Sequence, residues 1–342
     1  MILVESPGLL TTVQDSGRFG YEQFGVVQSG AMDLPALQAA NVLVGNAPNT
    51  AGLEITLTGP VLVFEEPAVF AVTGARFALT LDAQPIETGR AYAAAAGARM
   101  AFGSLLDGCR AYFAVAGGFA LPEVLGSLST SVRHRLGGYE GRALRKGDRL
   151  PLRRPGLLPG PLSRRVLPAG FFGAPDRPVR VLPGPQDDRF TERGLRTFLS
   201  SPYTVLQDSD RMGCRLSGEK IEHLTDGNIL SDGIAPGSVQ VPTDGQPIVM
   251  LADRQTVGGY TKIATVISVD LPRLAQSRPG DRLRFAAVSL AQAQALLKTW
   301  YARLAWLEGG IRSPGSGGGH FPLLVGEYTI QSVQEERSCN IR

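Results

Sequence analysis

The sequence contains an internal repeat, and this repeat constrains the fold more strongly than any other feature of the chain. Three short motifs occur twice in the same order: Val13 to Gly20 (VQDSGRFG) returns as Leu206 to Gly213 (LQDSDRMG), Asp82 to Ile86 (DAQPI) as Asp244 to Ile248 (DGQPI), and Gly147 to Leu150 (GDRL) as Gly280 to Leu283. The spacing between the copies shortens along the chain, as loop deletions in the second copy would produce. The repeat therefore predicts two structurally related units, with Arg18 and Arg211 in equivalent positions.

The glycine and proline content predicts what these units are made of. The 342 residues include 42 Gly and 24 Pro, well above a usual combined share of roughly 12%. Frequent turn residues without a collagen-like period imply many short strands. We expect a mainly β protein with a few helices: a first β unit at 1–155, a linker rich in Pro and Arg at 156–177, and a second β unit at 178–288.

The C-terminal region has a different pattern. Ser289 and Gln292 match a capping box, in which a Ser side chain and a Glu or Gln three residues later close the first turn of a helix. Apolar residues then recur at helical spacing, which predicts a helix over 289–308. Residues 309–342 begin with a Gly- and Ser-rich run, so we expect them to form a flexible tail.

Charge and cysteine content narrow the class of protein. The net charge is only +3, and no run of Lys or Arg could follow a phosphate backbone, so no nucleic-acid partner is expected. No stretch approaches the roughly 20 apolar residues of a membrane span. The three cysteines are far apart and form no CxxC motif, and the N-terminus does not resemble a signal peptide. We therefore expect a cytoplasmic protein with no membrane association.

Several common catalytic motifs are absent from the sequence. The three histidines are isolated and form no HExxH motif, so no metal site is predicted within this chain. There is no GxSxG elbow for a nucleophilic serine and no GxxxxGK[ST] loop for a nucleotide. Any chemistry must therefore come from polar side chains set in turns.

Polar residues gather in three turn-rich segments. The first covers Gln14, Asp15 and Arg18 and is followed by Asp33 and Asn41. The second is the run 208–213, and the third and densest is 239–262. Amide, carboxylate, guanidinium and ammonium groups between glycines could hold a small planar amide and polarise its carbonyl group.

Each cluster also has a structural interpretation, because an Asp followed by Arg or Gly commonly caps a turn. The repeat preserves Asp15 and Arg18 in both halves, which favours a structural or secondary role for the first cluster (Gln14, Asp15, Arg18, Asp33, Asn41). Asp210 replaces the glycine of the first copy, so the repeat does not explain it. For Gln240, Asp253, Gln255 and Lys262, binding and plain turn formation remain open alternatives, whereas Cys214 is best interpreted as a buried thiol.

Within these clusters the sequence resembles a known family. The resemblance rests on TVQDxGRxGY at 12–21, SGAMD at 29–33, ANxLVGN at 40–46, LPGPQD at 182–187, SDRMG at 209–213, QVP at 240–242 and DRQTxGGY at 253–260. These motifs are similar to those of the 5-oxoprolinase C-subunit family, also called the KipA or biotin-dependent carboxyltransferase-like family and allophanate hydrolase subunit 2. Ser16 and Val27 depart from the family's usual residues, and the tail after about residue 309 has no match in it.

The resemblance implies both a fold and a partnership. The fold would be two cyclophilin-like β-barrel units. The activity would be ATP-dependent cleavage of 5-oxoproline to L-glutamate, carried out together with subunits B and A, with ATP and Mg bound at a shared site. We expect the chain to be inactive alone, because it carries no nucleotide motif of its own.

The density of polar residues places the expected site in the second unit. We predict catalytic roles for Asp210, Arg211 and Lys262, and substrate binding by Gln240, Asp253, Gln255 and Tyr260. Arg211 could pair with a substrate carboxylate, since a guanidinium can bind both oxygens at once. Gln240 or Lys262 could polarise the lactam oxygen.

Two alternatives remain open. The family also resembles the carboxyltransferase region of urea carboxylase, where carboxybiotin donates CO2 to urea; this chain has no biotin-attachment Met-Lys-Met, so a separate carrier would be needed. The other alternative is a non-enzymatic regulator that binds a sensor-kinase inhibitor, as the KipA name implies.

Overall fold

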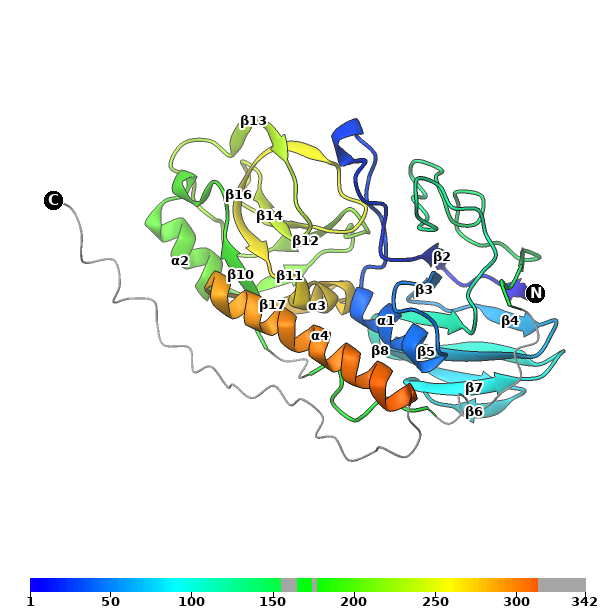
Figure 1. The fold of residues 1–342 in the computed structure, drawn as a ribbon. Coiled ribbons are helices and arrows are strands. Elements are labelled where there is room, and N and C mark those ends of the chain that lie inside the picture. Colours follow the sequence, from blue (N-terminus) through cyan, green and yellow to red (C-terminus); the bar gives the residue numbers. More distant parts are fainter. Residues whose placement is uncertain (155–164, 174–176, 313–342) are drawn as a thin grey trace.

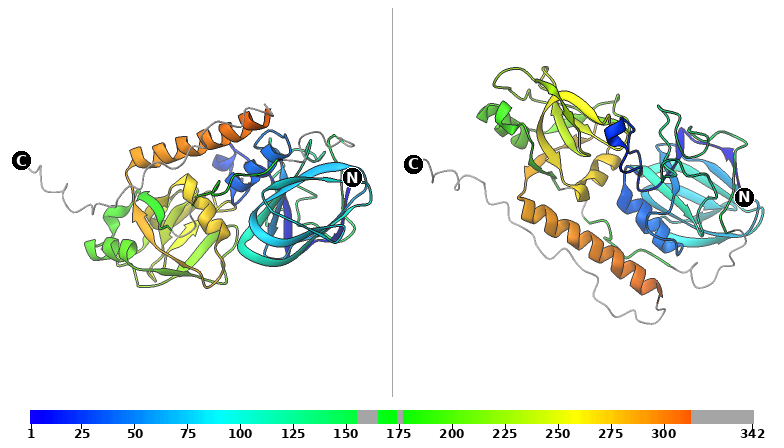
Figure 2. Two further views of the ribbon diagram at one scale, coloured as in Figure 1. Left: turned by 90° about the horizontal axis from the view of Figure 1, so that it is seen from below. Right: turned by 45° about the horizontal axis from the view of Figure 1, so that its top comes forward.

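The structure is a computed structural model that describes residues 1–154, 165–173 and 177–312 (Figure 1). Two β units lie side by side, and a long C-terminal helix runs along both of them (Figures 1 and 2). None of the helices in these ranges is both long and apolar enough to span a membrane.

The first unit is a nine-stranded sheet. Its strands are β1 (Ile2–Ser6), β2 (Leu10–Gln14), β3 (Gly52–Thr56), β4 (Val61–Phe64), β5 (Ala68–Leu81), β6 (Gln84–Ile86), β7 (Arg90–Ala94), β8 (Arg99–Val115) and β9 (Arg149–Leu150). The two long strands, β5 and β8, pair antiparallel over most of their length and bend at register shifts. In the core that the curved sheet encloses, the rings of Phe70 and Phe113 stack, and Phe64 packs against Phe70 at a tilt.

The second unit is a separate nine-stranded sheet. Its strands are β10 (Val179–Pro183), β11 (Tyr203–Val205), β12 (Gly213–Ser217), β13 (Asn228–Gly233), β14 (Ser238–Val241), β15 (Ile248–Met250), β16 (Val257–Val266), β17 (Arg282–Leu283) and β18 (Phe285–Ala287). The strand β16 is central, because it pairs with β10, β13 and β14. In the core of this unit the rings of Phe198 and Phe285 stack, and Tyr203 packs against Phe285 at a tilt.

Helices fill the spaces around the sheets. They are α1 (Leu34–Leu43), α2 (Glu192–Ser200), α3 (Leu271–Gln276) and α4 (Leu290–Arg312), with short 3-10 turns η1 (Glu22–Phe24), η3 (Asp187–Arg189) and η4 (Ser268–Asp270). The prediction of a mainly β fold with barrel-like units is confirmed: one sheet forms a half-barrel and the other a nearly closed barrel.

One of the repeated motifs folds in the same way in both units. In the first unit, the backbone N–H groups of Gly147 and Val4 donate to the carbonyls of Val4 and Asp148 (2.8 Å each). In the second, Gly280 and Val205 form the same pair of hydrogen bonds with Val205 and Asp281 (2.9 Å each). The Gly-Asp-Arg-Leu turn therefore closes against one strand in each unit, β1 and β11.

The longest repeated motif does not follow this equivalence. Arg18 lies after β2 and donates to the carbonyls of Val124 and Ser129 within its own unit. Arg211 lies before β12 and contacts carboxylates instead. The prediction that the two arginines occupy equivalent positions is wrong. The same sequence motif follows strand β2 in the first unit but precedes strand β12 in the second.

The C-terminal helix extends beyond its predicted end. Ser289 and Gln292 form the expected capping box, with hydrogen bonds of 2.8 and 3.2 Å between their side chains and backbone N–H groups. The helix continues through 309–312, a stretch that the sequence pattern assigns to the tail, because each glycine costs a helix only about 1 kcal/mol relative to Ala. Residues 313–342 lie outside the described part of the chain.

The predicted linker is partly packed against the rest of the molecule. Its residues 156–164 and 174–176 lie outside the described ranges, but Phe171 is buried and meets the ring of Trp300 on α4 edge to face at 5.6 Å. Leu304 and Leu307 of α4 join the same cluster and pack against α1. The linker and α4 therefore help to hold the two units together.

Candidate functional site

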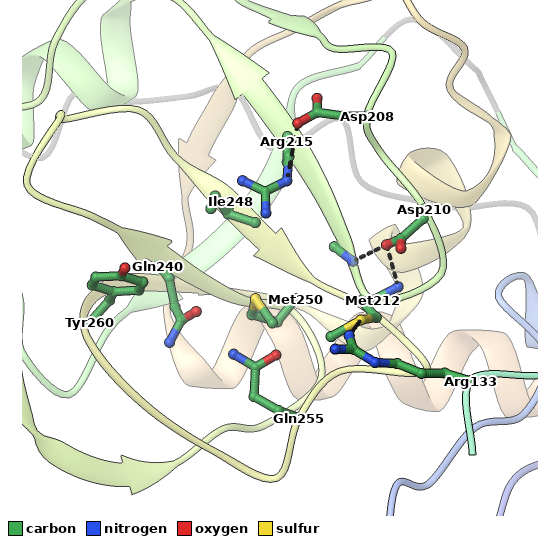
Figure 3. Close-up of a pocket in the computed structure, with 11 residues that line it drawn as sticks. Arg133, Asp208, Asp210, Met212, Arg215, Gln240, Ile248, Met250, Gln255 and Tyr260 are labelled. Atoms are coloured by element: carbon green, nitrogen blue, oxygen red, sulfur yellow. Dashed lines mark hydrogen bonds and ion pairs between the residues drawn. The ribbon is translucent and has the colours of Figure 1, made fainter. Parts of the chain in front are cut away.

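A cleft of about 410 Å³ opens on the second unit (Figure 3). The second unit contributes the turn before β12, the strands β12, β14, β15 and β16, and the turn before β16, and the first unit contributes one residue, Arg133. The full lining is Arg133, Asp208, Asp210, Met212, Gly213, Arg215, Gln240, Ile248, Met250, Gln255 and Tyr260. Its volume is typical of small-molecule sites, which run from about 300 to 1,000 Å³. The structure thus brings together Asp210, Gln240, Gln255 and Tyr260, four of the residues singled out from the sequence.

Gln240 lines this cleft and carries a buried hydrogen-bond donor that is unused among the described residues. The residue lies on β14, and only 2% of it is exposed to solvent. Its Nε2 atom is buried and has no hydrogen-bond partner in the described part of the chain. Burying an amide without a partner costs about 1–3 kcal/mol, so this donor is suited to a ligand that enters the cleft.

The backbone of Gly258 makes room for the two glutamine amides. A Cβ atom at this position would lie 2.9 Å from Nε2 of Gln240 and 2.6 Å from Cδ1 of Ile234. It would also lie 3.5 Å from Nε2 of Gln255. A side chain at Gly258 would therefore push the Gln240 amide from its position in Figure 3 and would touch the Gln255 amide.

The turn before β12 forms another wall of the cleft. One oxygen of Asp210 accepts hydrogen bonds from the backbone N–H groups of Met212 (2.7 Å) and Gly213 (3.2 Å). Asp208 pairs with Arg215 at 3.3 Å on the same wall. Asp210 therefore combines a turn-capping contact with a place in the cleft.

Arg133 reaches the cleft from the first unit. Its Nη1 atom lies 2.7 Å from the thioether sulfur of Met212. The side chain is exposed, and within the described part of the chain no carboxylate lies within ion-pair distance of it. No sequence signal points to this residue, because it belongs to the other unit and to no motif.

Arg211 is expected from the sequence to bind substrate, but its guanidinium is occupied by protein groups. It donates to both oxygens of Asp253 (2.9 and 3.0 Å), to the carbonyl of Gly30 (2.7 Å) and to Glu54. Burial by itself would lower the pKa of Arg211, but the charges of Glu54 and Asp253 outweigh it and raise the pKa. Arg211 and Asp253 therefore lie outside the cleft lining, as a buried ion-pair group.

Glu54 is the main residue of this group that the sequence motifs do not include. It lies on β3 with 1% of its side chain exposed. Besides Arg211, it accepts hydrogen bonds from the N–H of Met32 and the hydroxyl of Tyr112, both at 2.8 Å. A single Glu within an apolar strand indicates a buried charge pair, and the sequence of Gly52–Thr56 shows this pattern.

Lys262 also lies outside the cleft lining. Its buried ammonium group pairs with Asp232 at 2.8 Å and contacts the carbonyl of Gly233 at 3.3 Å. The hydrogen bond from Lys262 and that from the Gly233 N–H lower the pKa of Asp232. Lys262 thus ties β13 to β16, the strand that carries Tyr260.

Three residues of the first cluster hold their own unit together. Asp15 accepts hydrogen bonds from the N–H of Gly17 (2.8 Å) and from the N–H of Leu128 (2.6 Å). Gln14 donates to the carbonyl of Thr130 at 3.0 Å. Arg18 is buried and donates to two carbonyls, as described above, and burial lowers its pKa.

The remaining two residues of that cluster lie at the ends of α1. Asp33 caps the helix by accepting from the N–H of Ala36 (2.9 Å), and its other oxygen accepts from Gln276 of the second unit (2.8 Å). Burial raises the pKa of Asp33. Asn41 donates to the carbonyl of Thr50 at 2.6 Å. These contacts agree with the structural interpretation.

The groups of the cleft do not fit ATP with Mg²⁺. A triphosphate needs free backbone N–H groups together with Lys or Arg. Here Asp210 already occupies the N–H groups of Met212 and Gly213, and Arg215 is paired with Asp208, so among the described lining residues Arg133 is left as a single cation for a triphosphate. Among the described residues, no group of three or more His, Cys, Asp or Glu side chains could hold a metal ion.

Comparisons with known proteins identify the family. The model of the carboxyltransferase domain, subdomain A and B, matches residues 24–287. The C subunit of 5-oxoprolinase from Escherichia coli is 40% identical over 314 residues, which cover 90% of this chain and 98% of that protein. The solved structure of a urea amidolyase from K. lactis superposes with a TM-score of 0.84 and 32% identity.

A urea carboxylase structure from Kluyveromyces lactis matches with a TM-score of 0.81 and 31% identity. These two matches cover 90% and 91% of this chain but only 20% and 29% of the larger chains. The similarity to the bacterial protein, by contrast, extends over nearly the whole of both chains. The chain belongs to the family of 5-oxoprolinase C subunits, and its residues 24–287 match the carboxyltransferase domain of the subdomain A and B type.

Proposed function

We propose that this chain is the C subunit of a cytoplasmic ATP-dependent 5-oxoprolinase and that it acts with subunits A and B to cleave 5-oxoproline to L-glutamate. The similarity to nearly the full length of the E. coli protein supports this proposal. The single structural observation that carries it is the buried, unpartnered Nε2 of Gln240 in the cleft. This N–H donor fits a ligand with a carbonyl oxygen.

Gln240 has the role of polarising the lactam carbonyl. The lactam is stabilised by resonance, so its ring carbon becomes electrophilic only when electron density moves onto the oxygen. A donor that is already fixed and shielded from water stabilises that developing charge at little reorganisation cost. Gln255 and Asp210 orient the substrate, and the ring of Tyr260 covers it at the mouth of the cleft.

Arg211, Asp253 and Lys262 act as positioning residues. Arg211 is flanked in sequence by Asp210 and Met212, and its ion pair with Asp253 fixes the turn that carries them. The N–H of Asp253 also donates to the carbonyl of Arg211 at 2.8 Å, which sets the start of the loop leading to Gln255. Lys262 fixes the position of β16 through its ion pair with Asp232.

ATP and Mg²⁺ are proposed to bind at a site shared with the partner subunits, outside this cleft. That arrangement accounts for two features: the cleft groups do not fit a triphosphate, and the sequence contains no phosphate loop. It also explains why the chain alone should not hydrolyse 5-oxoproline.

The experiment is to reconstitute the three-subunit complex and measure ATP hydrolysis that depends on 5-oxoproline. The isolated chain should give no turnover. In the complex, Gln240→Leu should lower kcat by about 10²-fold or more, as does loss of one donor to a developing oxyanion. The free energy of unfolding should not fall, because the variant removes a buried N–H group that has no partner among the described residues. A complex that binds 5-oxoproline but never turns it over would favour a non-enzymatic binding role.

A second candidate is the carboxyltransferase component of a biotin-dependent, urea-carboxylase-like system. The observation that favours it is the superposition with the K. lactis urea amidolyase at a TM-score of 0.84. This candidate predicts biotin-dependent transfer of CO2 to urea when a carboxybiotin carrier is added. Transfer to urea without any 5-oxoproline-dependent ATP hydrolysis would replace the first proposal with this one.

A further inference from the structure

We infer that Arg133 recognises a carboxylate on the substrate, so that the cleft selects an amide carrying a carboxylate group over a neutral amide such as urea. This inference rests on the proposed function, because it concerns the same cleft. It names a residue of the first unit as a determinant of specificity for a site built mainly by the second.

The arginines around the cleft differ in how their charges are balanced. Arg211 is saturated by two carboxylates and a carbonyl, and Arg215 is paired with Asp208. Among the described residues, Arg133 has one hydrogen-bond contact, with the sulfur of Met212, which is a weak acceptor. Within the described part of the chain, Arg133 is therefore the arginine of the cleft whose charge no carboxylate balances.

The positions of Arg133 and Gln240 in the cleft also favour this role. Figure 3 shows Arg133 and Gln240 on opposite sides of the cleft, with Gln255 and Met250 between them. In 5-oxoproline the lactam oxygen and the carboxylate project from the two ring carbons that flank the nitrogen, so we place the lactam oxygen at Gln240 and the carboxylate at Arg133. The planar guanidinium can then bind both carboxylate oxygens in place of its weak contact with the thioether.

The carboxylates of the cleft are compatible with an anionic group at this place. Asp208 is neutralised by Arg215, and one oxygen of Asp210 is held by two backbone N–H groups. The substrate carboxylate would therefore lie on the Arg133 side of the cleft, and the amide on the Gln240 side. Urea, which has no carboxylate, would gain nothing from Arg133.

The test measures binding of 5-oxoproline and of 2-pyrrolidinone, the same ring without the carboxylate, to the assembled complex by calorimetry. Arg133→Ala should weaken 5-oxoproline binding about 10- to 100-fold, as loss of a charged hydrogen-bond pair does. Arg133→Lys should recover only part of this loss, because an ammonium group lacks the planar fork. Binding of 2-pyrrolidinone should be unchanged in both variants.

The matched control is Arg135→Ala, since Arg135 is an exposed cation of the same loop and lies outside the cleft lining. It should bind 5-oxoproline like the wild type. Equal binding of 5-oxoproline by the wild type and Arg133→Ala would overturn the inference, as would an equal loss for both ligands. A complete absence of 5-oxoproline binding to the wild type would overturn it too.

The result for Arg133 can be distinguished from a failure of the proposed function. If the wild-type complex shows no ATP hydrolysis that depends on 5-oxoproline, the proposed function fails. The inference is then judged on binding alone, with 5-oxoproline and urea as ligands of the full chain. Binding of 5-oxoproline that depends on Arg133 would still support it, whereas binding of urea in preference to 5-oxoproline would contradict it.

Discussion

Arg211 of the second unit and Glu54 of the first form an ion pair that is buried where the two units meet. Their side chains are 8% and 1% exposed. Both charges are shielded from water. Glu54 also accepts hydrogen bonds from the N–H of Met32 and the hydroxyl of Tyr112, and Arg211 also donates to the carbonyl of Gly30. The pair therefore couples the position of the cleft turn to the first unit.

Removing the guanidinium should destabilise the fold strongly. Arg211→Ala leaves Asp253 without its ion-pair partner and leaves Glu54 with the more distant Arg110, at 4.0 Å, and breaking a buried pair in this way costs about 3–5 kcal/mol. Urea unfolding would measure the loss. Arg215→Ala is the control, because its pair with Asp208 is exposed and should contribute about 0–1 kcal/mol. Unchanged unfolding of Arg211→Ala together with lost turnover would instead indicate a direct catalytic role.

A methyl group at Gly258 should damage the cleft without disturbing the strand. The new Cβ would crowd the Gln240 amide and Ile234, as the distances above show, whereas Gly258 needs no left-handed backbone. We expect Gly258→Ala to raise KM for 5-oxoproline by about tenfold and to cost about 1–3 kcal/mol of stability through overpacking. Gly233→Ala, on the paired strand, is the control, since its Cβ would meet nothing within 4 Å. An unchanged KM would show that the amides do not contact substrate.

Local sequence patterns predict those parts of the molecule that nearby residues determine. Turn residues indicate the β-rich class, and the capping box marks the start of α4. The polar runs at 208–213 and 239–262 contain nine of the residues that line the cleft, because their turns and strands are neighbours within one unit. Such features depend on residues close together in the chain or on strands paired in one sheet.

The contacts between the units could not be predicted in this way. Glu54 lies 157 residues before Arg211, and Arg133 lies 79 residues before Met212. Nothing in the local sequence of Arg211 distinguishes a guanidinium free for substrate from one neutralised by a distant strand. For the same reason, the repeat predicts an equivalence of Arg18 and Arg211 that their partners do not share.

The two described cysteines should be unreactive in the folded protein. Burial raises the pKa of Cys214 to about 11, and it also raises the pKa of Cys109. Since the thiolate is the reactive form, iodoacetamide at pH 8 should modify neither residue until urea is added. Peptide mapping by mass spectrometry would follow each site separately from Cys339, which lies outside the described residues. Rapid labelling of Cys214 in the native state would contradict its burial.

Asp148 should give the protein an acid-sensitive part of its stability. Partial burial opposes ionisation of Asp148, but hydrogen bonds from the Arg142 guanidinium (2.7 and 3.0 Å) and the Arg145 N–H (2.7 Å) outweigh it and lower the pKa. A folded-state pKa below the unfolded value of about 3.9 means that the stabilisation is fully present above that pH. It is lost as the pH falls through the folded-state pKa.

Asp148→Asn should therefore lower the free energy of unfolding by about 1–2 kcal/mol at pH 7, and the difference from wild type should shrink as the pH falls below about 4. Asp281→Asn is the matched control from the repeated turn. Asp281 accepts the same hydrogen bond, from the N–H of Arg278 at 2.8 Å, but forms no ion pair in the described part of the chain. An Asn oxygen can keep the turn hydrogen bond at either position, so the control should change little at pH 7. Urea unfolding from pH 7 to pH 3 measures both variants, and equal losses at positions 148 and 281 would mean that the Arg142 pair contributes nothing.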